Sequence, residues 1–234
     1  MHVRSIDNCP RCSLHRVCFA PGALRQSCAV PRLPVHPGKL APGEVLYVAG
    51  QGCSALYALR SGCIKDVVTR RNGAETVVQF CFAGEVAGLG GLATARARST
   101  AIALTATRYC RISWASFRQL AAEVPETGHE LVRLLAATVT AAHELVVSVL
   151  ERDALARVAG LLLDISARLR RGGLDGSHFR LSVSRGDIAS YLGLTIETVS
   201  RCFSELDRRR LIAVRGKDLR FLRPPGLQLL AGEA

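Results

Sequence analysis

With 234 residues, the chain is long enough for two domains of about 100 residues, each with its own core. Hydrophobic residues make up 49% of it, but charged residues are interspersed, and no apolar run reaches the roughly 18 residues of a membrane helix. No basic segment followed by an apolar stretch opens the chain, which excludes a secretion signal, so we expect a cytoplasmic protein with no membrane partner. The net charge of +12 favours an anionic partner such as nucleic acid, although a basic surface can also serve solubility alone.

Residues 1–37 are expected to form an irregular arm, because they hold four cysteines and five prolines. Cys9, Cys12 and Cys18 lie within the ten residues "CPRCSLHRVC". Three thiols are too few for a tetrahedral metal site and an odd number for disulfides. In a cytosolic chain, clustered cysteines more often bind metal or react than form structural disulfides. Their spacing leaves open a zinc site, an iron–sulfur cluster and a thiol pair that oxidises.

Residues 38–115 read as a β domain. Short runs rich in Val, Ile, Leu, Tyr and Thr, such as "ALYALRSG" and "TVVQFCFAG", are separated by glycines. Asn72-Gly73 lies between two of these runs and is a strong hairpin signal. The pattern predicts a small antiparallel barrel or jelly roll.

Residues 116–153 are predicted to be a long helix that pairs two chains. Its apolar residues recur at alternating spacings of three and four, which is the heptad pattern of a two-stranded coiled coil. The alternative is a long amphipathic helix packed on its own domain. The predicted dimer seam consists of Val132, Leu135, Val139, Ala142, Val146 and Val149.

Residues 154–234 contain a pattern typical of a winged helix-turn-helix. In the segment 184–212, Ser184 can cap a first helix together with Asp187, and Gly193 suits a tight turn. Thr195 can then cap a second helix, and "LIAVRGKDLRFL" reads as a β-hairpin wing with Gly216 at its tip. The alternative is an ordinary helical hairpin with a solvated polar face.

The outward face of the second helix carries groups that can read bases. Glu197, Ser200 and Arg201 share one side of it; arginine can bridge guanine, and glutamate can accept from cytosine. Basic residues beyond that helix and on the wing are placed to meet phosphates; they are Arg208, Arg209, Arg210, Arg215, Lys217 and Arg220. The candidate DNA-binding residues are Glu197, Ser200, Arg201, Thr195, Thr198 and Arg185.

A β-roll, a long helix and a winged helix-turn-helix, in that order, resemble the Crp–Fnr superfamily of bacterial transcription factors. "SALYALRSGCIK", "FAGEVAGL" and "SRGDIASYLGLTIETVSR" are most similar to the branch named for fumarate and nitrate reduction regulation (FNR). The resemblance implies an α+β fold and a homodimer that binds a TTGAT-like inverted repeat in double-stranded DNA, with RNA polymerase as a further partner. No nucleophile–base pair, phosphate loop or carboxylate pair indicates an enzyme.

Cyclic-nucleotide-binding members of the superfamily carry a glutamate for the ribose and an Arg-Ser pair for the phosphate. In an alignment on "FAGEVAGL", Leu89 stands in the place of the glutamate. Arg98-Ser99 is one residue out of register, with Ser99 where the arginine belongs. A cyclic phosphate without these partners would bind poorly, so we expect no cyclic-nucleotide site.

The FNR branch instead implies an oxygen-labile 4Fe–4S cluster on four cysteines. Cys9, Cys12 and Cys18 match its C-x2-C-x5-C arm, and Cys110 in "ATRYCRI" aligns with its fourth ligand. The resemblance favours this cluster, and the alternative is a regulator with a zinc, thiol-redox or nitric-oxide-sensing site. Cys28 is a spare that could replace a ligand, and His15 is expected to be a surface residue. The cysteines expected in cores are Cys53, Cys63, Cys81 and Cys202.

The implied mechanism couples the cluster to dimerisation. The intact cluster would hold the arm on the β-roll near the start of the long helix and favour pairing through the valine-rich seam. Members of the branch can carry an acidic residue in this helix, where like charges oppose pairing. The seam here has no carboxylate, and Ala142 lies at its middle. We therefore expect dimerisation without a cluster to be easier in this chain.

Overall fold

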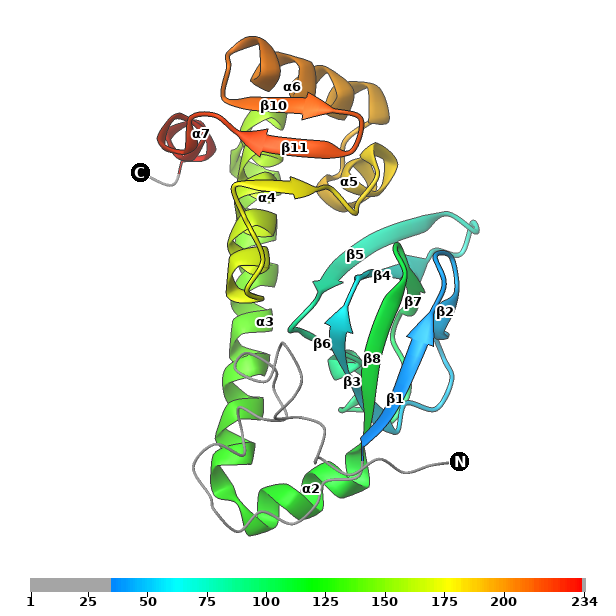
Figure 1. Cartoon of the computed structure of the whole chain (residues 1–234). Coiled ribbons are helices and arrows are strands. Elements are labelled where there is room, and N and C mark those ends of the chain that lie inside the picture. The colour runs from blue at the N-terminus through cyan, green and yellow to red at the C-terminus, as the bar shows by residue number, and fades with distance from the viewer. Residues whose placement is uncertain (1–34, 233–234) are drawn as a thin grey trace. The chain divides into compact units, whose positions relative to one another are not determined.

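The computed structural model describes residues 35–232, and Figure 1 shows their helices and strands. The chain divides into two compact units after Thr138. The first contains a β-roll (residues 35–113) and the second a winged-helix domain (residues 154–231), with a long helix connecting them. The predicted α+β fold is confirmed, and each unit is described by itself.

The β-roll consists of two four-stranded antiparallel sheets, with strand orders β1-β8-β3-β6 and β2-β7-β4-β5. β1 begins inside the segment predicted to be an irregular arm, because it pairs with β8, a partner distant in sequence. The elements of the roll are β1 (Val35–Leu40), β2 (Val45–Tyr47), β3 (Ala55–Ser61), β4 (Cys63–Thr69), β5 (Glu75–Phe82), β6 (Val86–Ala87), η2 (Leu89–Gly91), β7 (Thr100–Ala103) and β8 (Thr107–Ser113).

The hairpin predicted at Asn72-Gly73 joins β4 to β5. Gly73 has a φ of +80°, a backbone conformation that favours glycine. The N–H of Arg70 donates to the carbonyl of Ala74 at 2.8 Å, which closes the turn. Local turn chemistry therefore sets the register of these two strands.

The side chains of the β-roll form two separate apolar clusters because neighbouring residues on a strand point to opposite faces. The inner cluster lies between the sheets and comprises Leu59, Ile64, Cys81, Ala87, Ala101 and Ala103. The outer cluster lies on the other face of the β1-β8-β3-β6 sheet and is completed by helical residues; it comprises Val35, Leu56, Ala58, Val86, Ile112, Phe117, Leu120 and Val124.

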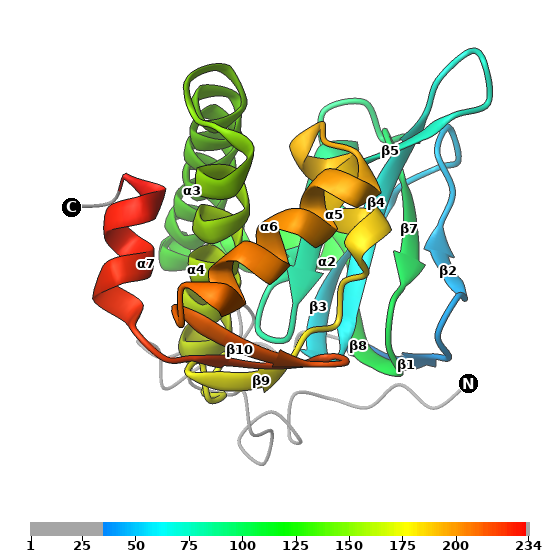
Figure 2. The same ribbon diagram turned by 90° about the horizontal axis from the view of Figure 1, so that it is seen from above.

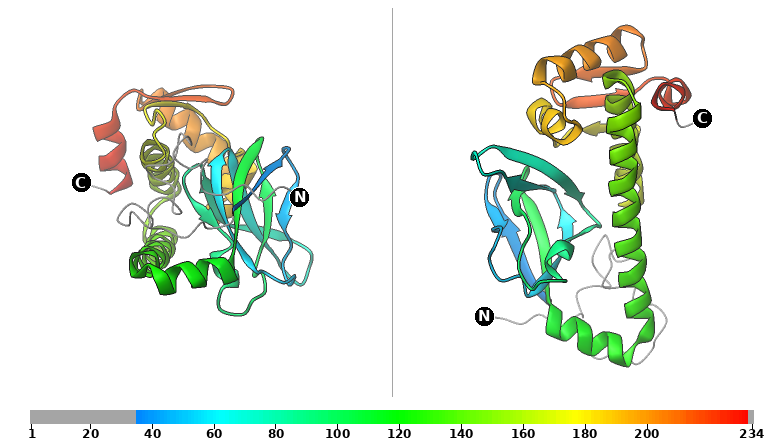
Figure 3. Two further views of the ribbon diagram at one scale, coloured as in Figure 1. Left: turned by 60° about the horizontal axis from the view of Figure 1, so that its bottom comes forward. Right: turned by 180° about the vertical axis from the view of Figure 1, so that it is seen from behind.

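The region predicted as one helix over 116–153 is two helices, so that prediction is wrong in detail. α2 (Trp114–Glu123) ends at Val124, which has an extended backbone, and α3 (Pro125–Glu151) begins with a proline. A proline disfavours the helical conformation of the residue before it and is tolerated in a first turn, which explains both boundaries. The bend between α2 and α3 is visible in Figure 3. Leu131 and Leu134 of α3 pack on the outer cluster.

By length and composition alone, α3 also qualifies as a helix that could cross a membrane, which the sequence analysis did not expect. Its 27 residues include the valine-rich seam and few charges. None of the qualifying window is buried in the structure. A helix that pairs with a second chain through an exposed apolar face has the same composition.

The winged-helix domain places four helices around a three-stranded sheet of order β10-β11-β9, and Figure 2 shows these elements. The C-terminal helix was not predicted, although Pro224 and Pro225 at its first positions are a recognised start signal. The elements are α4 (Ala154–Arg171), β9 (His178–Arg180), α5 (Arg185–Leu192), α6 (Ile196–Arg208), β10 (Ile212–Arg215), β11 (Asp218–Phe221) and α7 (Pro224–Ala231).

The predicted caps of the helix-turn-helix are confirmed. The hydroxyl of Ser184 accepts from the N–H of Asp187, whose carboxylate accepts from the N–H of Ser184, forming a capping box. Gly193 ends α5 with a φ of +65°, and Thr195 caps α6 by accepting from the N–H of Thr198. A cap of this kind contributes about 1 kcal/mol. Val199 and Phe203 of α6 are buried, as predicted.

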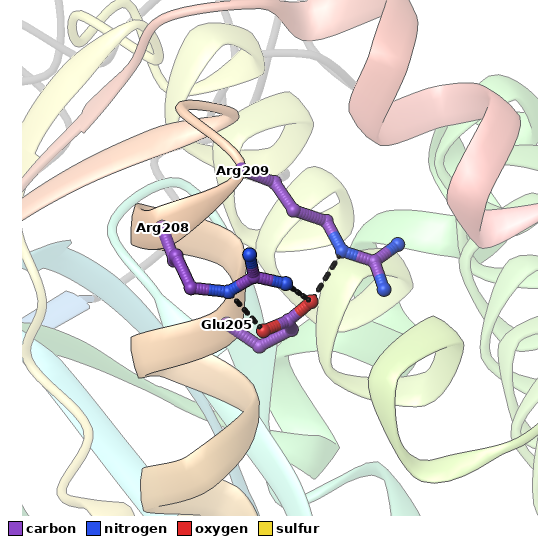
Figure 4. A network of polar contacts seen from close by, with 3 residues as sticks. All are labelled: Glu205, Arg208 and Arg209. Carbon is purple, nitrogen blue, oxygen red and sulfur yellow. Dashed lines mark hydrogen bonds and ion pairs between the residues drawn. The ribbon is translucent and has the colours of Figure 1, made fainter.

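The last turn of α6 holds an ion-pair network that Figure 4 shows from close by. The carboxylate of Glu205 accepts from Arg208 at 2.7 and 2.8 Å and from Arg209 at 2.6 Å. These hydrogen bonds and charges lower the pKa of Glu205 to about 2. Of the three consecutive arginines at the end of α6 that were predicted to meet phosphates, Arg208 and Arg209 are thus held by a carboxylate of that helix.

We predict that the Glu205 carboxyl titrates with a midpoint near 2 instead of its ordinary 4.5. Because the folded pKa is lowered, the network stabilises α6 above pH 4.5 and is lost as the pH falls towards 2. Carboxyl-carbon NMR of the full chain measures the midpoint. Substituting Arg208→Gln together with Arg209→Gln should raise it, whereas Arg210→Gln should leave it unchanged. A midpoint near 4.5 in the unsubstituted protein contradicts the network.

Candidate functional site

The outward face of α6 presents the three residues predicted to read bases. Glu197, Ser200 and Arg201 are all exposed. Hydrogen bonds from the backbone N–H of Glu197 and from the Thr195 hydroxyl lower the pKa of Glu197, and the charge of Arg201 adds to this. Glu197 is therefore an acceptor at neutral pH, as a contact to a cytosine amino group requires. The Ser200 hydroxyl donates to the carbonyl of Ile196 at 2.9 Å and keeps its capacity to accept.

The other candidates for DNA contact are held in different ways. The hydroxyls of Thr195 and Thr198 lie 3.0 Å apart at the start of α6, where phosphates favour a helix N-terminus. The guanidinium of Arg185 lies over the Phe203 ring, 3.1 Å from its centre, and burial lowers the pKa of Arg185 to about 10. The structure thus holds Arg185 against the core by a cation–π contact, which sequence reasoning missed.

The wing extends the basic surface of the domain. Arg215 ends β10 and pairs with Asp218, and Gly216 between them has a φ of +60°. Arg215, Lys217 and Arg220 are exposed, as are Arg208, Arg209 and Arg210 at the end of α6. An exposed reading helix beside a basic hairpin is the geometry with which winged helices bind duplex DNA.

Cys110 lies on the outer face of the β1-β8-β3-β6 sheet. It occupies the middle of β8, opposite Pro37 of β1 and Ala58 of β3. It shares one face of β8 with Ile112, a member of the outer cluster, and its half-buried side chain packs against that cluster. Because Leu131 and Leu134 pack on the same cluster, Cys110 and the first turns of α3 belong to one packing unit.

On the same sheet face, two basic residues lie beyond Cys110 on the side away from Ile112. Arg108, two residues before Cys110, pairs directly with Lys39 of β1, so both residues lie on the Cys110 face. Both are exposed. Cys110 therefore lies between the apolar outer cluster and a pair of exposed basic residues on one sheet face.

The remaining cysteines divide as expected where the structure describes them. Cys53, Cys63, Cys81 and Cys202 are buried. Cys9, Cys12, Cys18 and Cys28 lie outside the described residues, as does His15. Within residues 35–232, no group of three or more His, Cys, Asp and Glu side chains is placed to hold a metal ion.

The interior of the β-roll has an electrostatic character opposite to that of a phosphate site. The buried carboxylate of Asp66 accepts from the hydroxyl of Ser99 at 2.7 Å and from that of Tyr47 at 2.8 Å. Burial raises the pKa of Asp66, and the two hydroxyls partly offset this. Arg98 is exposed, and Leu89 packs on the outer cluster. The buried charged group among these residues is thus a carboxylate, and the one arginine among them, Arg98, is exposed.

The predicted dimer seam is exposed in the single chain. Val132, Val139 and Val146 are 53–65% exposed, and Leu135 is 37% exposed. Ala142 is exposed, and Val149 is half-buried. Val147 and Leu150, which the seam pattern omitted, add exposed apolar surface near the end of α3. An apolar stripe of this size on one helix marks a surface that another chain can cover.

Two family descriptions match the chain. The cyclic nucleotide-binding domain matches residues 37–124, and the Crp-like helix-turn-helix domain matches residues 156–230. The first describes the β-roll. The second covers the caps, the turn and the wing.

The chain is similar over nearly its whole length to named bacterial regulators. It is 33% identical to the transcriptional activator protein Anr of Pseudomonas protegens, over 96% of this chain and 93% of that protein. It is 30% identical to the fumarate and nitrate reduction regulatory protein of Vibrio cholerae, over 96% of this chain and 90% of that one.

Solved structures share the fold. FixK2 from Bradyrhizobium japonicum superposes with a TM-score of 0.78 at 24% identity, over 85% of this chain and 98% of that one. A CRP-family transcriptional regulator from Thermus thermophilus gives 0.67 at 23% identity, over 84% and 97%. As expected, these relatives are DNA-binding regulators and not enzymes. The chain belongs to the Crp/Fnr family of transcription regulators.

Proposed function

We propose that this regulator responds to oxygen through a 4Fe–4S cluster held by Cys9, Cys12, Cys18 and Cys110. The observation that carries the proposal is the position of Cys110, half-buried on the sheet face that packs against α2 and the start of α3. Four thiolates are the usual ligands of such a cluster, and the C-x2-C-x5-C arm supplies the other three. The similarity to Anr and to a fumarate and nitrate reduction regulatory protein supports the same assignment.

A group bound to Cys110 and to the three arm cysteines would fasten the part of the arm before β1 to the sheet face on which Leu131 and Leu134 of α3 pack. Leu131 and Leu134 contact that face, while Val132 and Val139 of the same helix stay exposed for a second chain. Closing the site would restrict the first turns of α3 and favour pairing through the seam. The cluster must then stabilise the dimer more than the monomer, since only a differential effect shifts an equilibrium.

The functional division follows from this proposal. Residues 1–37 are the ligand-bearing arm and 38–115 the sensor domain, 116–153 carry the dimerisation helix and 154–234 bind DNA. In the cytoplasm, the homodimer with an intact cluster binds a TTGAT-like inverted repeat and works with RNA polymerase. The predicted seam consists of Val132, Leu135, Val139, Ala142, Val146 and Val149.

In this proposal α6 reads the half-site. Glu197 and Arg201 contact base edges, and Ser200 contacts a base edge or a phosphate. Thr195, Thr198 and the basic wing fix the register by phosphate contacts. Arg185 would reach DNA only after leaving the Phe203 ring, so its contribution is proposed to be the smallest.

We predict that protein purified without air is brown and contains about four iron and four sulfide per chain, and that its visible absorbance bleaches in air. Substituting Cys110→Ser should abolish the colour, because the site then loses one of its four thiolates. The matched control is Cys81→Ser, which removes a thiol of the same domain from the inner cluster.

The absorbance spectrum before and after air, with iron, sulfide and zinc analysis, measures this prediction. A colourless protein that contains zinc, or no metal, contradicts the cluster and supports the alternative zinc or thiol site. Bleaching by nitric oxide but not by air contradicts oxygen as the signal.

We predict that Arg201→Ala weakens binding to a TTGAT-like inverted repeat by about 1–3 kcal/mol per half-site, because it removes a bidentate contact to guanine. The same substitution should reduce discrimination at the contacted base pair. Arg215→Ala in the wing is the control and should weaken binding similarly for all sequences, with a smaller salt dependence. Fluorescence anisotropy at two salt concentrations measures both effects; unchanged base discrimination in Arg201→Ala would remove this residue from the reading site.

A further inference from the structure

The connection between α3, which carries the predicted dimer seam, and α4, the first helix of the winged-helix domain, is very short. α3 ends at Glu151, and Asp153 already caps α4 by accepting from the N–H of Ala156 at 2.8 Å. Only Arg152 and Asp153 lie between the two helices. The direction of α4 relative to the end of α3 therefore depends on two residues and on whatever holds them.

One side chain of α4, that of Arg157, links this connection to α5. The Nε of Arg157 donates to the carbonyl of Arg152 at 2.9 Å, and its Nη1 donates to the carbonyl of Leu192 at 3.4 Å. Arg152 directly follows α3, and Leu192 is the last residue of α5. Arg157 itself is half-buried in the first turns of α4. A single guanidinium thus joins α3, α4 and α5.

The two carbonyls share one property, which explains why an arginine occupies this position. Each lies at the C-terminal end of a helix, where carbonyls lack helical partners and the helix dipole is negative. A guanidinium offers several N–H donors in a fixed plane, so it can serve two such ends at once. A lysine would bring the charge without that plane.

The reading helix α6 packs on the two helices that Arg157 joins. It contacts both α4 and α5. The Leu192 carbonyl that accepts from Arg157 belongs to the last residue of α5, directly before the turn at Gly193 that leads to α6. The contacts of Arg157 therefore bear on the helices against which the reading helix lies.

We propose that Arg157 is a positioning residue that fixes the direction of each reading helix relative to the dimer helix, and so sets which half-site spacing the dimer accepts. It touches no base, and it acts through the ends of α3 and α5. The proposal rests on the proposed binding of a dimer to an inverted repeat, because spacing has meaning only for two linked reading helices.

The test measures binding of the full chain, under the conditions in which it binds DNA best, to three kinds of duplex. These are a TTGAT-like inverted repeat at its best spacing, the same repeats with one base pair added to or removed from the spacer, and a duplex with a single half-site. The variants are Arg157→Met, which removes the donors, and Arg157→Lys, which keeps the charge. The control is Arg171→Met, which removes an exposed arginine from the other end of α4.

The unsubstituted protein and Arg171→Met should bind the duplex with the best spacing on the order of tenfold more tightly than the duplexes with an altered spacer. The reason is that rigidly held reading helices fit one separation. Arg157→Met should lose most of this preference while retaining its half-site affinity and its discrimination against a mutated half-site. Arg157→Lys should fall between the two and serves as the deciding variant if Arg157→Met does not fold. A merely structural role would weaken all duplexes alike.

Retention of the full spacing preference in Arg157→Lys and Arg157→Met overturns the inference and leaves the proposed function intact. Absence of any spacing preference in the unsubstituted protein overturns dimeric binding to an inverted repeat, and the inference with it.

Discussion

The exposed apolar stripe of α3 is the feature on which the other parts of this regulator depend. Val132, Val139 and Val146 are each more than half exposed to water in the single chain. Burying such side chains gains about 1.5–3 kcal/mol each, and in this chain a second copy can provide the cover. The stripe is nevertheless short, because the seam spans fewer than three full heptads. Small energies added at either end of α3 can therefore decide how much dimer forms.

Both ends of α3 are held by contacts that can supply such energies. At its start, Leu131 and Leu134 pack on the cluster that also receives Cys110, so a group bound at Cys110 would act directly on the first turns. At its end, Arg157 donates to the carbonyl of Arg152. In the proposed mechanism, a group bound at Cys110 controls whether two chains pair. The Arg157 contacts control which half-site spacing the dimer accepts.

Local signals in the sequence predicted most of the helix-turn-helix. Contacts between elements distant in the sequence were not predicted. Ser184 and Gly193 act on their own helices, so residue type and spacing were enough to place them. The pairing of β1 with β8, by contrast, joins strands about seventy residues apart, and no local pattern in β1 predicts it. The cation–π contact of Arg185 and the Arg157 contacts arise only when helices pack together. The break before Pro125 was visible in the sequence, but the apolar periodicity on either side of it favoured one helix.

A cluster held by Cys110 and the arm is proposed to stabilise the dimer more than the monomer. Sedimentation velocity over a range of concentrations, on one anaerobic preparation before and after exposure to air, measures this difference. The dimer dissociation constant should rise when the cluster is lost, with some dimer still present at micromolar concentration because the seam has no carboxylate. A dissociation constant that is the same before and after bleaching would show that the cluster does not act on dimerisation.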